Sequence, residues 1–136
     1  MRAALFFSVS TVLASLLAAP VAIAQDKKPY SVVDGKVDRG TYNGYRRYHA
    51  SCHVCHGPDG LGSSYAPALV DSLKVIDEAT FNDVVINGRQ NLSAGQEKVM
   101  PSFAAAPDVT DYLADIYAYL KARSDGAIGR GRPERQ

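Results

Sequence analysis

The sequence predicts a small all-α domain in which three main helices and long loops enclose one large apolar group. A length of 136 residues suits a single domain. Apolar residues recur at helical spacing in three segments, and no segment alternates in the way that predicts a strand. Since loops take up much of the remaining chain, few apolar residues are left to form a core. We therefore expect a bound apolar group to complete that core.

The composition excludes several classes of protein and partner. Apolar residues make up 46% and charged residues 21% of the chain, as in ordinary globular proteins, so a disordered chain or a multi-span membrane protein does not fit. The 15 Lys and Arg residues nearly balance the 14 Asp and Glu residues. Because no excess positive charge is available to bind phosphates, we expect no nucleic-acid partner.

Residues 1–24 are predicted to be a secretory signal peptide. Arg2 precedes an apolar run that Pro20 interrupts, and Ala22-Ile23-Ala24 supplies small residues for cleavage. The run is shorter than the roughly 20 apolar residues of a spanning helix, although an uncleaved anchor is the alternative. We expect export to the periplasm, with no stable membrane insertion after cleavage. Cleavage removes Arg2 and leaves 14 basic and 14 acidic residues.

The exported chain is predicted to have three parts. Residues 25–39 are polar and without clear periodicity, which indicates an extended lead. Residues 40–123 form the folded domain. Residues 124–136 contain three glycines and three arginines and are predicted to be a flexible, solvated tail.

Three helices are predicted inside the domain, from the spacing of apolar residues and from helix end signals. The first repeats tyrosines along one side, the second lies between the capping residue Asp77 and the stop signal Gly88, and the third has a long apolar stripe. The predicted helices are 40–51, 77–87 and 108–123, with loops over 57–73 and 89–106.

A Cys-x-x-Cys-His motif follows the first helix at residues 52–56, and this motif is the attachment signature of c-type haem. Two thiols one helical turn apart can add to the two vinyl groups of one porphyrin edge. His56 then stands next to the tether and can donate a ring nitrogen to the iron. We therefore expect one haem c, bound covalently through Cys52 and Cys55, to be the apolar group that completes the core.

Two other interpretations of the motif fit less well. A thioredoxin-like dithiol needs its cysteines at a helix start within a βαβ unit, and no strands are predicted. A zinc site made of Cys52, His53, Cys55 and His56 would require four ligands within five residues to reach one tetrahedral ion, whereas zinc motifs separate their ligand pairs by many residues.

The second axial ligand of the iron is predicted to be Met100. It is the only methionine outside the predicted signal peptide, and it lies beside Pro101 in a predicted loop rather than in a helical stripe. Gap-filling in a core is the alternative role of such a methionine. His/Met ligation is a recurring arrangement in cytochromes c. His49 lies on the attachment helix and His53 within the tether, so both are predicted to be surface residues.

From Gly44 to Lys121 the chain resembles the class I, mitochondrial-type, cytochromes c. The resemblance implies that Gly44 and Tyr48 let the first helix cross closely against the last. It also implies that the Pro67 carbonyl accepts a hydrogen bond from His56, which would orient the imidazole and raise its basicity. The matching segments are Gly44 with Tyr48, residues 55–60, Pro67 in 66–69, Met100-Pro101-x-Phe103, and residues 115–121.

A narrower resemblance concerns residues 40–49, which run into the haem motif. This stretch is similar to small periplasmic cytochromes linked to methanol metabolism. The resemblance implies that a quinoprotein alcohol (methanol) dehydrogenase donates electrons, and that another cytochrome or an oxidase accepts them. No residue independently indicates methanol, so this expectation rests on analogy.

These features predict an electron-transfer protein rather than an enzyme. With both axial positions filled by His56 and Met100, substrate cannot reach the iron, and no constellation of catalytic residues is visible. We expect a monomer that docks transiently through the haem edge. Two alternatives remain: a haem enzyme or gas sensor in which Met100 does not bind, and a permanent subunit of a larger dehydrogenase. Candidates to line the haem pocket are Tyr45, Tyr65, Leu69, Phe81, Phe103 and Leu120.

Overall fold

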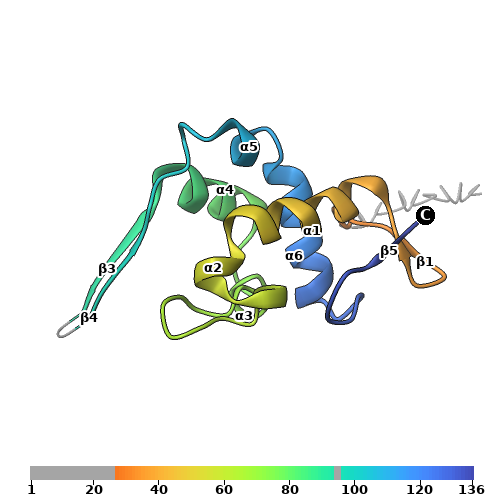
Figure 1. Ribbon diagram of the computed structural model, residues 1–136, viewed down its shortest axis with the longest axis horizontal. Helices are drawn as coiled ribbons and strands as arrows, with labels where there is room; N and C mark the ends of the chain where they lie inside the picture. Colours follow the sequence, from red (N-terminus) through yellow and green to blue (C-terminus); the bar gives the residue numbers. More distant parts are fainter. Residues whose placement is uncertain (1–26, 94–95) are drawn as a thin grey trace, which may run out of the picture.

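The computed structural model describes residues 27–93 and 96–136, so the predicted signal peptide lies outside the described residues. The fold is mainly helical, with two short sheets (Figure 1). The helices are α1 (Arg39–Ser51), α2 (His53–His56), α3 (Leu69–Ser72), α4 (Glu78–Asn87), α5 (Pro107–Thr110) and α6 (Leu113–Ser124), with one 3-10 turn, η1 (Pro58–Gly60). The strands are β1 (Val32–Val33), β2 (Lys36–Val37), β3 (Arg89–Ser93), β4 (Gln96–Met100) and β5 (Glu134–Arg135).

The centre of the fold is the crossing of α1 and α6, which lie against each other in Figure 1. At the crossing, a Cβ on Gly44 would lie 1.8 Å from the Asp115 carbonyl oxygen, so only glycine lets the two backbones approach this closely. Tyr48 and Tyr119 are both fully buried beside the crossing, with ring centroids 5.6 Å apart. The close helix crossing that the resemblance implies is therefore confirmed.

The buried core extends from this crossing to the neighbouring elements. It combines aliphatic and aromatic side chains from all parts of the folded chain. Its members are Val37, Tyr48, Leu73, Phe81, Val85, Val109, Ile116, Tyr117, Tyr119, Leu120, Ala122 and Ile128.

The helices α1 and α4 each follow a capping aspartate. At α1, the Asp38 carboxylate accepts the Thr41 N–H at 3.0 Å, and at α4 the Asp77 carboxylate accepts the Thr80 N–H at 2.8 Å. Each bond satisfies a backbone donor that has no partner within its helix. The helix α4 ends at Gly88, as the sequence predicts. The predicted starts and stop of these helices agree with the structure to within one residue.

Loss of the α1 cap gives a testable, pH-dependent effect. Although partial burial works in the opposite direction, hydrogen bonds from Thr41 and Ser31 hold the pKa of the Asp38 carboxyl below its usual value. Asp38→Ala should therefore lower the free energy of unfolding by about 1 kcal/mol at pH 7. A carboxylate whose pKa is lower in the folded state stabilises the fold above its unfolded-state pKa, and this stabilisation is lost as the pH falls through its folded-state pKa. The difference in unfolding free energy between the wild type and Asp38→Ala should therefore shrink in acid. Thermal melts of both proteins between pH 7 and pH 3 measure it; a difference that grows in acid would contradict this account.

The predicted third helix, 108–123, is wrong as a single helix because the structure divides it into α5 and α6. The backbone leaves the helical range at Tyr112, with φ −124° and ψ 19°. The Tyr112 ring lies under the Arg47 guanidinium, 3.8 Å from ring centroid to guanidinium carbon. Arg47 also pairs with Asp108 at 2.9 Å. These contacts with α1 stabilise the break, and they leave the Arg47 side chain half-buried.

The expectation of no strands is also wrong. The lead at 25–39 contains an antiparallel hairpin of β1 and β2 within its described part. The predicted loop at 89–106 contains a second hairpin, in which Arg89 of β3 pairs with Met100 of β4. This β3–β4 hairpin extends away from the helices (Figure 1).

The prediction of a solvated tail at 124–136 is corrected as well. The strand β5 pairs in parallel with β2, Ile128 is 9% exposed, and the Gln136 N–H donates to the Val37 carbonyl at 3.0 Å. We call residues 125–136 the C-terminal arm. Figure 1 shows the arm running back along the body of the fold to the first hairpin. The arm is thus part of the packed structure.

Candidate haem site

The Cys-x-x-Cys-His motif lies where α1 passes into α2. The Cys52 N–H still donates to the Tyr48 carbonyl of α1 at 2.8 Å, and the His56 N–H donates to the Cys52 carbonyl at 3.0 Å. The second bond closes one helical turn over the motif, so that Cys52, Cys55 and His56 belong to the same turn. Both cysteines are free thiols. The structure thus brings the three residues of the predicted attachment site together.

The two thiols differ in their surroundings. Cys55 is exposed, while Cys52 is partly buried and packs against the hydrophobic core. Burial, with a smaller contribution from neighbouring Cys55, raises the pKa of the Cys52 thiol to about 11. At neutral pH this thiol therefore keeps its proton in the haem-free chain.

His56 is held by a specific second partner. The side chain is 7% exposed, and its Nδ1 lies 3.0 Å from the Pro67 carbonyl oxygen. Since a carbonyl oxygen only accepts, Nδ1 must carry the proton, which leaves the Nε2 lone pair free for a metal. A backbone carbonyl on the second ring nitrogen is a common feature of metal-binding histidines. The contact that the resemblance implies between His56 and Pro67 is present.

A tightly folded loop joins His56 to Pro67. The Gly62 N–H donates to the His56 carbonyl at 2.7 Å. Gly57 has φ +72°, and a Cβ there would lie 2.3 Å from the Gly62 carbonyl oxygen. A side chain at Gly57 would therefore push the loop away from its position. The loop geometry fixes the distance between the imidazole and its carbonyl partner.

Met100 is supplied by a different part of the chain, at the end of β4. It is partly buried and packs against the same hydrophobic core as Cys52. The segment after it is fastened to the end of α4: the Ser102 hydroxyl donates to the Ile86 carbonyl, and the Phe103 N–H donates to the Val85 carbonyl at 3.0 Å. Met100 therefore stands on an anchored segment at the base of the β3–β4 hairpin.

Asp59, which the sequence analysis did not single out, links the haem-motif loop to the C-terminal arm. It is 5% exposed, and its carboxylate accepts the Gly131 N–H at 2.9 Å and the Arg130 Nε–H at 3.4 Å. Its own carbonyl accepts the Arg123 Nε–H at 3.3 Å. The Asp59-Gly60 pair signals a turn in the sequence, but no local pattern reveals a partner about 70 residues away.

This link gives a second testable prediction. Asp59→Ala should lower the free energy of unfolding by about 1–3 kcal/mol, because the Gly131 N–H and Arg130 lose their acceptor. Asp71→Ala is the matched control, since Asp71 is an exposed carboxylate whose pair with Lys74 is worth at most about 1 kcal/mol. Urea unfolding of the haem-loaded proteins measures both. If both variants lose the same free energy of unfolding, the buried Asp59 contacts stabilise the fold no more than an exposed ion pair does.

The predicted pocket-lining residues have different positions. Leu120 is fully buried, and Phe81 lies in the core against Tyr117, with ring centroids 5.4 Å apart. Tyr45 packs edge-on against Tyr119 at 5.6 Å. Tyr65, in contrast, is 76% exposed. Their role as haem contacts stays a prediction.

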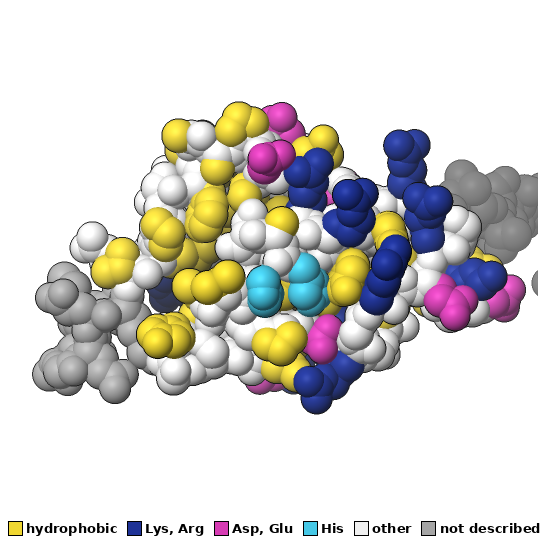
Figure 2. Space-filling view, in the orientation of Figure 1, with side chains coloured by type: hydrophobic (Ala, Val, Ile, Leu, Met, Phe, Trp, Pro, Cys, Tyr) yellow, Lys and Arg dark blue, Asp and Glu magenta, His cyan; other side chains and the backbone are white. Residues whose placement is uncertain are grey.

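The residues present fit a covalently attached haem better than a bare metal ion. Within residues 27–93 and 96–136, no group of three or more His, Cys, Asp or Glu side chains is arranged to hold a metal ion. Val54, inside the motif, is 71% exposed, and Leu61, in the loop after it, is 42% exposed. Figure 2 shows hydrophobic side chains gathered between the histidines and the β3–β4 hairpin. The two thiols suit the two vinyl groups of a porphyrin edge, the imidazole suits the iron, and the apolar surroundings suit the ring.

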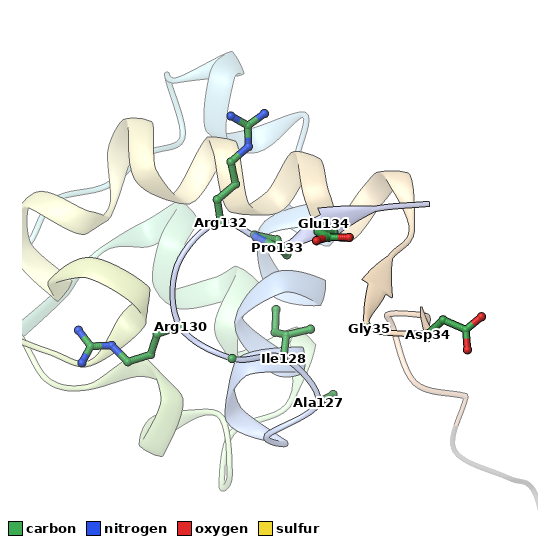
Figure 3. A pocket seen from close by; sticks show the side chains of 9 residues that line it. Asp34, Gly35, Ala127, Ile128, Arg130, Arg132, Pro133 and Glu134 are labelled. Atoms are coloured by element: carbon green, nitrogen blue, oxygen red, sulfur yellow. The ribbon is translucent and has the colours of Figure 1, made fainter.

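A separate surface pocket lies between the first hairpin and the C-terminal arm (Figure 3). Its lining includes the charged residues Asp34, Arg130, Arg132 and Glu134, together with apolar residues such as Ile128 and Pro133. None of the predicted site residues contributes to it. This pocket is therefore distinct from the candidate haem site.

Comparisons with known proteins found a matching family model and two similar cytochromes. A family model described as "Cytochrome C oxidase, cbb3-type, subunit III" matches residues 41–120. Cytochrome c-555 of Methylococcus capsulatus is 36% identical over 127 residues, which cover 93% of this chain and 91% of that protein. Cytochrome c-553I of Paracoccus denitrificans is 46% identical over 114 residues, which cover 83% of this chain. The chain spans about half the length of the Paracoccus protein, since the match covers 50% of it.

A solved structure is also similar. The crystal structure of the c-type cytochrome XoxG from Methylobacterium extorquens AM1 gives a TM-score of 0.69 at 44% sequence identity. The match covers 83% of this chain and 76% of that one. The likeness therefore extends to the architecture around the haem motif as well as to the sequence.

Proposed function

This chain belongs to the c-type cytochromes, with a class I-like monohaem fold, and from that premise we propose that it is a one-electron carrier of the periplasm. The proposal rests above all on one observation. His56 is buried, its Nδ1 is fixed by the Pro67 carbonyl, and two free thiols lie on the same helical turn. This arrangement suits covalent haem attachment with one protein ligand prepared for the iron.

Each residue of the proposed attachment site has a separate role. Bound haem c supplies the Fe(III)/Fe(II) couple. Cys52 and Cys55 would hold the haem through two thioethers, each the product of adding one S–H across one vinyl group with no atom released. His56 would donate Nε2 to the iron, while the Pro67 carbonyl on Nδ1 would keep the imidazole oriented and make it a stronger donor.

Met100 is proposed as the second axial ligand. Its thioether is soft and neutral, which favours the reduced iron and raises the reduction potential. The bonds from Ser102 and Phe103 to the end of α4 hold its segment in place, so little rearrangement accompanies a change of redox state. With both axial positions filled, the protein transfers electrons through its surface and does not act as an enzyme on a substrate at iron.

The proposed donor is a quinoprotein alcohol (methanol) dehydrogenase, and the proposed acceptor is another cytochrome or an oxidase. The resemblance of residues 40–49 to methanol-linked cytochromes supports this, together with the similarity to XoxG and cytochrome c-555. We propose that the protein acts as a monomer and docks transiently near the exposed Cys55 edge.

Export follows from the proposed signal peptide at 1–24. Among the helices of residues 27–93 and 96–136, none has the length and apolar character needed to cross a membrane. We propose residues 40–123 as the cytochrome domain, with the lead and the C-terminal arm packed onto it.

Stopped-flow reduction tests the proposed donor. Oxidised, haem-loaded protein is mixed with a purified quinoprotein methanol dehydrogenase, with and without methanol. We expect rapid methanol-dependent reduction of the haem. If dithionite reduces the haem while the dehydrogenase with methanol does not, the proposed donor is wrong although the carrier function can stand.

A further inference from the structure

Two histidines outside the haem ligand set lie next to each other where α1 meets α2. The ring centroids of His49 and His53 are 5.7 Å apart, and the ring planes differ by 23°. Both side chains are partly exposed, and histidine side chains lie side by side on the face shown in Figure 2. The chain has three histidines, so these two are the imidazoles that remain once His56 is assigned to haem.

His49 is held with one particular nitrogen available. Its Nδ1 lies 2.9 Å from the Tyr45 carbonyl oxygen, so Nδ1–H donates and Nε2 keeps its lone pair. The ring also packs against the rings of Tyr45 and Tyr48, with centroids 4.3 Å and 5.1 Å away. A donated N–H and a packed ring are the features that orient histidines toward metals. His49 is therefore orientated before any ion binds.

His53 complements this arrangement. Its Nδ1 is buried and has no hydrogen-bond partner in the described part of the chain. Nε2 is thus the ring nitrogen left for an external partner. Residues four apart on a helix stand one above the other. The Cys52 N–H donates to the Tyr48 carbonyl at 2.8 Å, so the last turn of α1 reaches the residue before His53.

We propose that His49 and His53 chelate one divalent transition-metal ion through their Nε2 atoms, with water completing the coordination. Imidazole nitrogens bind zinc, nickel and copper ions, and Cu²⁺ binds most tightly in this series. The metal–nitrogen distance is about 2 Å, so the two Nε2 atoms must approach to about 3 Å. The ring centroids are 5.7 Å apart, and since His49 is held by Tyr45, the proposal requires the His53 side chain to rotate toward it when the ion binds.

The position of this site links it to the haem. His53 directly follows the tethering residue Cys52, so a bound dication lies beside the attachment edge. A bound cation is commonly the largest local charge in a site, and positive charge disfavours Fe(III) relative to Fe(II). The reduction potential is therefore expected to rise when the site is filled.

Copper titration of the haem-loaded, tag-free protein tests the proposal. Calorimetry should show one Cu²⁺ per protein, and electron paramagnetic resonance should show nitrogen coupling from two imidazoles. His49→Gln and His53→Gln should each weaken binding at least about tenfold, because each removes one arm of the chelate. Arg46→Gln, an exposed change on the same helix, is the matched control and should keep the wild-type affinity.

Two results would overturn the proposed metal site. Absence of stoichiometric binding overturns the proposal, as does unchanged affinity in either histidine variant, since a chelate needs both rings. The haem absorption spectrum of each variant checks that it is folded and loaded. Because the readout is copper binding and not electron transfer, its failure would leave the proposed carrier function untouched.

Discussion

Replacing Gly44 with alanine is expected to destabilise the fold severely. The added Cβ would lie 1.8 Å from the Asp115 carbonyl oxygen and 3.0 Å from the Ile116 backbone nitrogen. These atoms belong to the backbone of α6, so rotation of a side chain cannot relieve the clash, and the two helices must separate. We expect a loss of at least about 3 kcal/mol, which lowers Tm by roughly 12–24 °C in a domain of this size.

Gly129→Ala is the matched control for this prediction. A Cβ at Gly129 has nothing within 4 Å, and the backbone there is not in the left-handed region. This change should alter the free energy of unfolding by less than about 0.5 kcal/mol. Thermal melts and the yield of haem-loaded protein compare the two variants. A Gly44→Ala protein with wild-type yield and Tm would contradict the close helix crossing.

Replacing Met100 with alanine is expected to have the largest effect on electron transfer. Loss of the thioether should lower the reduction potential by roughly 0.1 V or more, given that axial ligands set haem potentials over about 0.8 V. The iron should also become accessible to added carbon monoxide in the reduced protein. Potentiometric titration and the carbon monoxide spectrum measure these two changes.

Val99→Ala provides the comparison for Met100. Val99 is the preceding residue of β4 and is 58% exposed, so its truncation leaves the thioether in place. The potential and the response to carbon monoxide should stay as in the wild type. If Met100→Ala also leaves both unchanged, Met100 is not the ligand, and the enzyme or sensor alternative with an open iron site gains support.

The parts of the fold that could be predicted are those that depend on residues close together in the sequence. The helices at 40–51 and 77–87 show apolar spacing, and Asp77 and Gly88 mark the ends of the second one. The close crossing at Gly44 could not be obtained from spacing alone. It came from the resemblance to class I cytochromes c, and the backbone distance at Asp115 confirms it.

Two of the missed features, the strand β5 and the break before α6, depend on contacts between distant residues. The strands β1, β2 and β5 have two residues each, too few to show alternation, and β5 pairs with a strand almost 100 residues earlier. The break before α6 follows the packing of Tyr112 against Arg47 of another helix. The C-terminal arm is polar and rich in arginine, so its sequence predicts a solvated tail, although the arm packs against β2.

The candidate site shows the same division. Cys52, Cys55 and His56 form a local motif, and the structure places them on one turn. The partnership of His56 with Pro67 spans 11 residues and came from the resemblance. Asp59 and its contact with the C-terminal arm were missed, because the partner lies at the other end of the chain.

The absorption spectrum of the oxidised, haem-loaded protein tests the central claim most directly. We predict a low-spin spectrum with the methionine-sulfur-to-iron charge-transfer band in the red, which disappears in Met100→Ala. Together these results would establish His56 and Met100 as the axial ligands of an electron carrier. A high-spin wild-type spectrum without that band would contradict the account and indicate an iron site open to substrate or gas.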